Sequence, residues 1–330
     1  MYYNEDCISG SKEHLKDGTI DLIITDPPFA ISGDKLHKHY NRDEKYVIDG
    51  YIEIPVDQYR DFSIDWIAQA HRILKNDGSM YIVSGWSNLS DILLALEQNK
   101  FKIINHIIWK YNFGVYTKKK YVTSHYHILY CKKQNNKKVK FNTHCRFAPS
   151  EKTENNGSAL YSDLEDVWII NREYKHGKTK NKNQLPIKLL KKMILYSSDE
   201  NDLVCDLFLG SFSTAKVARA LNRNSTGFEI NSEAFNYQIN KIETIERGCM
   251  FKDLKIPERN VYFNQGKPWS EKDIEKLLTR YGALKKERYS DKESFEILSM
   301  EFGRGRFSIL NIIKAHKIKN LEDDGKLTGN

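Results

Sequence analysis

The sequence predicts a doubly wound α/β domain with a mostly parallel sheet, followed by a small all-α domain. Short apolar runs, typical of buried parallel strands, alternate with amphipathic segments of helical period over residues 1–256. Two of the runs lead directly into loops marked by proline or glycine. After about Pro257 the strand pattern stops and short capped helices follow, which indicates a separate domain over residues 257–330.

The elements of the first domain occur in the order that such a sheet requires. Strands are predicted at 20–25, 79–84, 101–109, 125–131, 202–207 and 225–230. Helices are predicted at 59–74, 89–98 and 215–221. Asn76-Asp77-Gly78 is expected to stop the first helix. Residues 132–165 are polar and lack periodicity, so an inserted basic target-recognition loop or small subdomain is expected there, extending to about residue 175.

The second domain is predicted to contain three helices. Ser270 is expected to cap the first, with Asp273 three residues further on. The second helix is placed at about 291–302 and the third at about 307–316, separated by the turn 303–306. Three short helices with a glycine turn before the last are typical of a helix-turn-helix domain.

Composition excludes several classes of protein. No apolar run approaches the roughly 18 to 20 residues of a membrane span, so a cytoplasmic protein is expected. The five cysteines are scattered and form no C-x-x-C pair, which indicates neither a disulfide framework nor a zinc site. No metal is expected.

The positive charge is concentrated in one part of the chain. The whole sequence has 52 Lys and Arg against 44 Asp and Glu. Between Val115 and Tyr196 there are 18 against 6, so the remainder is slightly acidic. Such a segment fits a phosphate-backbone binder, with Lys118, Lys119 and Lys120 as candidate contacts, but also a solvated lysine-rich surface.

Asp26-Pro27-Pro28-Phe29 follows the first predicted strand and has the chemistry to hold an exocyclic amino group. The lone pair of such a group is delocalised into its ring. A carboxylate and a backbone carbonyl that accept its N–H bonds favour a more tetrahedral, more nucleophilic nitrogen. Consecutive prolines stiffen the loop, and Phe29 offers a face on which a flipped base can stack.

A second motif has the pattern of a nucleotide-type cofactor site. The strand at 202–207 leads into a loop with Gly210, then a helix and the strand at 225–230. Glu229 lies near the end of that strand, after the glycine loop. A β-loop-α-β unit with an acidic residue at this spacing is typical of cofactor binding.

Together these motifs resemble the β class of amino-group DNA methyltransferases, in which the catalytic motif precedes the cofactor loop. Weaker similarities occur at residues 4–7, 72–79 and 183–186, and the resemblance spans roughly residues 3–245. It implies a Rossmann-like methyltransferase domain that uses S-adenosylmethionine to methylate a flipped base. Asp26 in the motif favours adenine N6, and cytosine N4 is the alternative.

The resemblance also implies roles for individual residues. The catalytic motif would be Asp26, Pro27, Pro28 and Phe29. The cofactor would contact Asp6, Cys7, Gln184, Pro186, Asp206, Phe208, Gly210, Ser211, Ser213, Thr214 and Glu229. Three positions depart from the family pattern: Phe212 stands where a second glycine is usual, Leu185 where lysine is usual and Asn183 where threonine is usual.

The first two departures motivate a different class of function, a catalytically silent DNA-binding regulator. A nicotinamide oxidoreductase is a more distant alternative, because it leaves Asp26-Pro27-Pro28-Phe29 unexplained. The three C-terminal helices resemble Myb-like modules. This implies DNA contacts by Arg304, Ser308, Asn311 and Lys314, with Phe307, Leu310 and Ile313 in the core. DNA is the expected partner, with a cognate restriction endonuclease and a homodimer as further possibilities.

Overall fold

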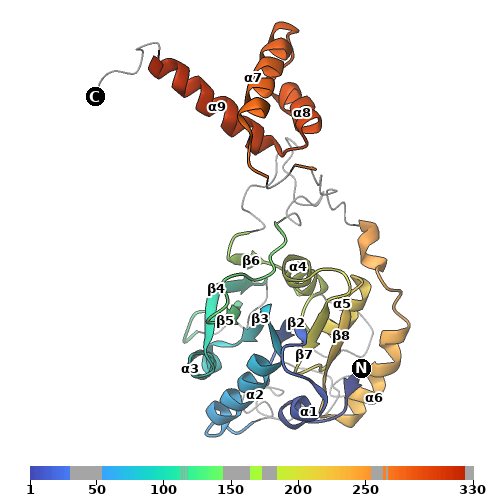
Figure 1. Ribbon diagram of the computed structural model, residues 1–330. Helices are drawn as coiled ribbons and strands as arrows, with labels where there is room; N and C mark the ends of the chain where they lie inside the picture. Colours follow the sequence, from blue (N-terminus) through green and yellow to red (C-terminus); the bar gives the residue numbers. More distant parts are fainter. Residues whose placement is uncertain are drawn as a thin grey trace. The chain divides into compact units, whose positions relative to one another are not determined.

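The protein forms two compact units, Met1–Pro257 and Glu258–Asn330 (Figure 1). The computed structural model describes residues 1–29, 54–112, 114, 116, 118–143, 164–172, 184–253, 263–264 and 267–323, with side chains to 316. Most of the predicted insert at 132–175 lies outside these residues. Within them, no helix is both long and apolar enough to cross a membrane.

The first unit is built on one mixed sheet. Its strands are β1 Tyr2–Tyr3, β2 Ile20–Thr25, β3 Leu74–Ser84, β4 Phe101–Lys110, β5 His125–Lys133, β6 Val167–Ile169, β7 Leu203–Asp206 and β8 Asn224–Phe228. The order across the sheet is β1-β8-β7-β2-β3-β5-β4-β6. The run from β1 to β3 is parallel, whereas β5 pairs antiparallel with both β3 and β4. The predicted α/β fold is confirmed.

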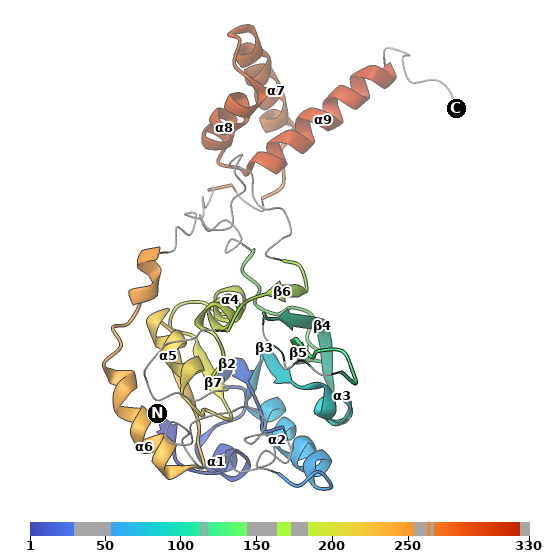
Figure 2. The same ribbon diagram turned by 180° about the vertical axis from the view of Figure 1, so that it is seen from behind.

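Helices cover both faces of this sheet (Figure 2). They are α1 Cys7–His14, α2 Tyr59–Ile73, α3 Leu89–Gln98, α4 Ile187–Ser197, α5 Ser213–Ala220 and α6 Ser232–Glu243. Buried residues of α1, α2 and α3 form one core cluster with one face of the sheet. Those of α4 and α5 form a second cluster with the other face. Burial of these two apolar faces is the main stabilising term of the unit.

The predicted stop at Asn76-Asp77-Gly78 was only partly right. Helix α2 does end at Ile73, but β3 begins at the next residue and includes the three stop residues. The pairing with β2 is irregular here, because Ile20 is opposite Leu74 whereas Leu22 is opposite Ser79. The turn-forming residues therefore form a bulge within the strand rather than a separate loop.

The second unit contains α7 Glu271–Lys286, α8 Asp291–Phe302 and α9 Arg306–Asp323. Ser270 caps α7 by accepting a hydrogen bond from the Asp273 backbone N–H, as predicted. Ser290 and Glu293 form a reciprocal capping box on α8. Gly303 ends α8 in the left-handed region at φ 58°, which glycine adopts without strain.

Candidate active site

The two loops that the sequence singled out meet at the centre of the sheet. Asp26 follows the end of β2, Asp206 ends β7, and these strands are parallel neighbours. From β2 the chain continues through α2 to β3 on one side. From β7 it continues through α5 to β8 on the other side. The strand order therefore reverses between β2 and β7, where open α/β sheets bind ligands at the carboxyl ends of their strands.

Asp26 presents a buried acceptor. Its Oδ1 is buried and has no hydrogen-bond partner among the described residues. Burial, together with the nearby Asp206 carboxylate, raises the pKa of Asp26 well above its usual range, while the Arg172 guanidinium opposes this rise. A buried acceptor without a donor is costly, so a ligand that brings an N–H to Oδ1 recovers free energy.

An aromatic group includes Phe29, three residues after this carboxylate in the same motif. Phe29 is buried and stacks on Tyr126 of β5, with ring centroids 5.7 Å apart and planes 13° apart. Tyr111 contacts the same tyrosine at 5.5 Å. The Arg172 guanidinium carbon lies 5.0 Å from the Tyr111 centroid and 5.4 Å from that of Tyr126. Sequence reasoning did not identify Arg172 as a member of the site.

Asp206 is held by the neighbouring strand β2 and by the loop that follows it. Its Oδ1 accepts hydrogen bonds from Thr25 Oγ1 at 3.2 Å and from the Phe208 backbone N–H at 3.1 Å. Burial raises its pKa to about 7, although the bonds from Thr214, Phe208 and Thr25 act in the opposite direction. The strand end thus concentrates acidic groups that a cationic ligand would stabilise in the ionised form.

The glycine loop and Glu229 are joined directly. The Gly210 backbone N–H donates to Glu229 Oε2 at 2.7 Å, and that of Asn231 donates to Oε1 at 2.8 Å. Gly210 adopts φ 49°. A Cβ on Gly227 would lie 2.1 Å from the Asp206 carbonyl oxygen, so only glycine permits β8 to approach β7 here. The loop therefore carries Glu229 at a defined position beside the strand ends.

Phe212 does not fill the loop in which it stands. It adopts the left-handed conformation, φ 59° and ψ 26°, that a glycine would take. Its ring is fully buried, with centroids 5.4 Å from Tyr2 and 5.7 Å from Phe235 of α6. The missing glycine is thus replaced by a strained residue whose side chain packs into a separate apolar cluster.

The other predicted cofactor residues of this loop are mostly buried. Ser211, Ser213 and Thr214 are each less than a tenth exposed. The hydroxyls of Ser211 and Ser213 share a hydrogen bond of 2.5 Å. On the other side of the sheet, Phe208 packs edge-on against Trp66 of α2 at 5.5 Å. Phe208 is therefore anchored in the core at the base of the loop.

The N-terminal segment reaches the same end of the sheet. Glu229 N donates to the Tyr3 carbonyl at 3.0 Å, and Asn4 Nδ2 donates to the Glu229 carbonyl at 2.7 Å. Asp6 Oδ1 caps α1 by accepting from Ile8 N at 2.9 Å and from Ser9 N at 3.0 Å. Cys7 is buried, and burial raises the pKa of its thiol well above the usual range. Its side chain belongs to the core.

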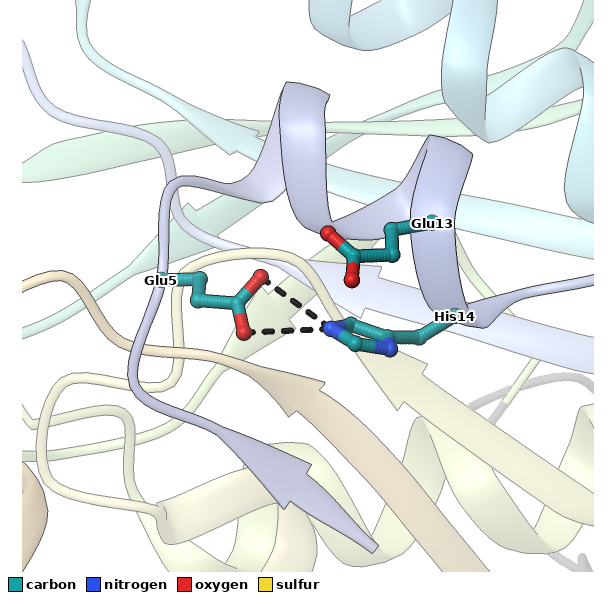
Figure 3. Close-up of side chains that lie close together, drawn as sticks. All are labelled: Glu5, Glu13 and His14. Carbon is teal, nitrogen blue, oxygen red and sulfur yellow. Dashed lines mark hydrogen bonds and ion pairs between the residues drawn. The ribbon is translucent and has the colours of Figure 1, made fainter.

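A small polar cluster lies on α1 and the segment before it (Figure 3). Ligand-type atoms of Glu5, Glu13 and His14 lie within 4.8 Å of one another. His14 Nε2 is 3.1 Å from both carboxylate oxygens of Glu5, and its ring stacks on Tyr3 at 4.2 Å. These contacts make Glu5 and His14 a partly exposed hydrogen-bonded pair with a stacked ring.

The segment before the cofactor loop is described from Gln184 onward. Gln184 is exposed, whereas Pro186 is buried and precedes the first turn of α4. Leu185, the second departure from the family pattern, is buried in the core cluster formed with α4. An apolar side chain at this position is therefore used for packing.

The predicted DNA-binding residues differ in exposure. Lys118, Lys119 and Lys120 are all exposed, as are Asn311 and Lys314 on α9. Ser308 is partly buried, and its Oγ accepts a hydrogen bond from Trp269 Nε1 at 2.9 Å.

Two expectations for the C-terminal unit need correction. Arg304 is only 5% exposed; its guanidinium stacks on Trp269 at 4.2 Å and donates to the Lys267 and Pro268 carbonyls. The Arg304 guanidinium therefore makes its contacts within the C-terminal unit. Phe307 was expected in the core but is 78% exposed, whereas Ile313 is buried as predicted.

Comparisons with known proteins agree with this geometry. Residues 20–241 match the N6/N4 family described as DNA methylase. The chain is 32% identical over 228 residues to the type II methyltransferase M.HpaI of Haemophilus parainfluenzae, covering 67% of each protein. It is 30% identical over 262 residues to the DNA adenine methyltransferase YhdJ of Escherichia coli, covering 73% of this chain and 82% of that protein.

The fold is also similar to that of proteins with solved structures. The complex of M1.HpyAVI with S-adenosylmethionine aligns with a TM-score of 0.50 and 23% identity, covering 73% of this chain and 98% of that one. A family match over most of the chain and two relatives of at least 30% identity lead to one conclusion. The protein belongs to the N6/N4 amino-group DNA methyltransferases, a family that uses S-adenosylmethionine and acts on DNA.

Proposed function

We propose that the protein is a site-specific adenine-N6 DNA methyltransferase whose target base enters the pocket at Asp26. The observation that carries this proposal is the buried Oδ1 of Asp26, which lacks a donor among the described residues and belongs to the same motif as Phe29, whose ring stacks on Tyr126. An acceptor next to an aromatic face matches a base that presents an amino group. Adenine is favoured by the relative described as a DNA adenine methyltransferase.

The residues at the strand ends fit S-adenosylmethionine. Asp206 and Glu229 are partly or fully buried carboxyl groups with raised pKa values, a setting that a cationic ligand relieves. We assign the ribose hydroxyls to Glu229 and the methionine region to the loop from Phe208 to Thr214. When bound, S-adenosylmethionine supplies an electrophilic methyl group on its sulfonium. Transfer of this methyl group requires no metal.

The chain's own residues would orient the amino group and then accept its proton. Asp26 Oδ1 and the Pro27 carbonyl accept the two N–H bonds, while Phe29 stacks on the flipped base. Methylation leaves the nitrogen with one proton too many. Because burial raises the pKa of Asp26, its carboxylate can take that proton once the N–C bond has formed.

The decisive test is transfer of labelled methyl from S-adenosylmethionine to unmethylated DNA, followed by nucleoside analysis. We expect N6-methyladenine from the wild type and a loss of at least about 1000-fold in Asp26→Ala. Asp65→Asn, a change at an exposed carboxylate on α2, serves as the control and should leave transfer unchanged. N4-methylcytosine would change the base, and normal turnover by Asp26→Ala would refute the assignment.

We further propose that exposed cations outside the pocket hold the DNA. Candidates are Lys118, Lys119 and Lys120 in the basic segment, with Asn311 and Lys314 on α9. A cognate restriction endonuclease and a homodimer are compatible with the type II methyltransferases among the relatives. Because its substrate is DNA, we place the protein in the cytoplasm.

A further inference from the structure

Arg172 is attached to the sheet at the edge of the aromatic group. It lies three residues after β6, and β6 pairs in parallel with β4. Two hydrogen bonds hold the intervening chain: Ile170 N donates to the Lys110 carbonyl at 3.0 Å, and Trp109 Nε1 donates to the Ile170 carbonyl at 2.8 Å. The backbone immediately before Arg172 is therefore tied to the end of β4.

The guanidinium is held by aromatic faces. Its central carbon lies over Tyr111 at 5.0 Å and over Tyr126 at 5.4 Å. Tyr126 in turn stacks on Phe29 of the catalytic motif. Cation–π contacts of this kind orient the plane of the guanidinium but leave its N–H groups to bond at the edge.

Two buried polar atoms lack hydrogen-bond partners among the described residues, one on Arg172 and one on Asp26. They are Arg172 Nε and Asp26 Oδ1. The positive charge of Arg172 nevertheless acts on Asp26, because it opposes the rise of the carboxyl pKa. A buried donor and a buried acceptor are thus left unbonded, and the Phe29–Tyr126 stack links the two segments that carry them. A ligand that presents an acceptor and a donor on one edge would satisfy both.

Building on the proposed function, we propose that Arg172 binds the target base, with Nε–H donating to the ring nitrogen next to the amino group that Asp26 accepts. In adenine these groups are N1 and N6, and in cytosine N3 and N4. Thymine and guanine present the opposite order, a carbonyl oxygen beside a ring N–H. The Asp26–Arg172 pair therefore selects amino bases and rejects keto bases at the reacting edge.

The test compares target analogues in an oligonucleotide whose methylated adenine has first been mapped with the wild type. Adenine, 1-deazaadenine and 7-deazaadenine are each placed at the target position. In the wild type, loss of N1 should lower kcat/KM by about 10- to 100-fold relative to adenine. Loss of N7, which this pairing does not use, should change kcat/KM little.

Variants separate Arg172 from other effects of the analogues. Arg172→Ala should lower kcat/KM on adenine and respond to 1-deazaadenine several-fold less than the wild type, because the ring-nitrogen contact is already gone. Comparing the two ratios cancels changes in amino-group reactivity and base pairing. Arg172→Gln keeps the side chain's polarity and covers the case in which alanine disrupts folding. Arg60→Ala, which removes an ion pair with Asp91 of α3, is the control and should behave as wild type.

Specific results would overturn the assignment. An equal response of wild type and Arg172→Ala to 1-deazaadenine would show that N1 is not the partner. If instead a methylphosphonate beside the target removed the difference between the two proteins, Arg172 would bind the phosphate, and the assignment would be wrong. Absence of transfer by the wild type to any DNA would overturn the proposed function together with this inference.

Discussion

Phe212 offers a direct test of how the cofactor loop tolerates a departure from its family's pattern. It holds φ 59° at the start of α5 while its ring is fully buried against Tyr2 and Phe235. Replacing Phe212 therefore has two opposing effects on the stability of the protein. Removing the ring loses apolar packing, whereas replacing the residue by glycine also removes the strain of a left-handed L residue.

The magnitudes are large enough to order the variants. Truncating a buried phenylalanine to alanine costs about 3–5 kcal/mol. The left-handed conformation costs an L residue about 1–2 kcal/mol, and alanine retains this cost while glycine does not. Phe212→Gly should therefore be more stable than Phe212→Ala by about 1–2 kcal/mol, although both are less stable than the wild type.

Phe235 supplies the matched control, because it contacts the same ring from within α6. In a helix interior, glycine is about 1 kcal/mol less favourable than alanine. The order of the two variants should therefore reverse at this position. Urea unfolding of all four proteins without cofactor measures both differences.

Binding of S-adenosylmethionine to the same variants completes the test. The Phe212 ring packs against Tyr2 and Phe235, away from the loop. We therefore expect neither Phe212 variant to bind S-adenosylmethionine more tightly than the wild type in calorimetric titrations. Tighter binding by Phe212→Gly would mean that the ring obstructs the loop. Equal stability of Phe212→Ala and the wild type would refute the packing argument itself.

Three further predictions concern pH and the C-terminal unit. Burial raises the pKa of Asp206 to about 7, above the value of about 3.9 in unfolded chains. The folded state then binds more protons, so Asp206 should make the free energy of unfolding fall as pH rises from about 4 to about 7. Asp206→Asn should flatten this slope in urea titrations between those limits, and an unchanged slope would contradict the cause. Lys314→Ala should reduce the slope of log Kd for DNA against log salt by about 1. Arg304→Ala should instead weaken hydrogen-exchange protection of α7–α9, and wild-type protection would argue against its packing role.

Much of the fold was predictable because its signals are local. The buried strand β2 and the amphipathic helix α3 have the bounds that apolar patterning predicted. The boundary at residues 76–78 was predicted less well. Gly78 and its neighbours favour a turn, but pairing with β2 draws them into β3 as a bulge. Local preference is weak compared with the hydrogen bonds and burial that a central strand gains.

Order along the chain also predicted the two halves of the site. Asp26 follows β2 and Glu229 follows β8, and the carboxyl ends of parallel strands meet at one edge of a sheet. Residue type then indicated the chemistry, because a carboxylate beside prolines and an aromatic residue suits an amino group.

Only the tertiary structure assigned Arg172 and Phe212 to their places. Arg172 lies in a segment without a motif, and its guanidinium reaches Tyr111 and Tyr126 through contacts between segments distant in sequence. Phe212 was evident as a departure, but the direction of its ring depends on the cluster formed with α6. The sequence by itself thus determined which strands lead into candidate site residues. Three-dimensional packing decided which side chains point toward the site and which point away from it, because a side chain's direction depends on neighbours that its own segment does not encode.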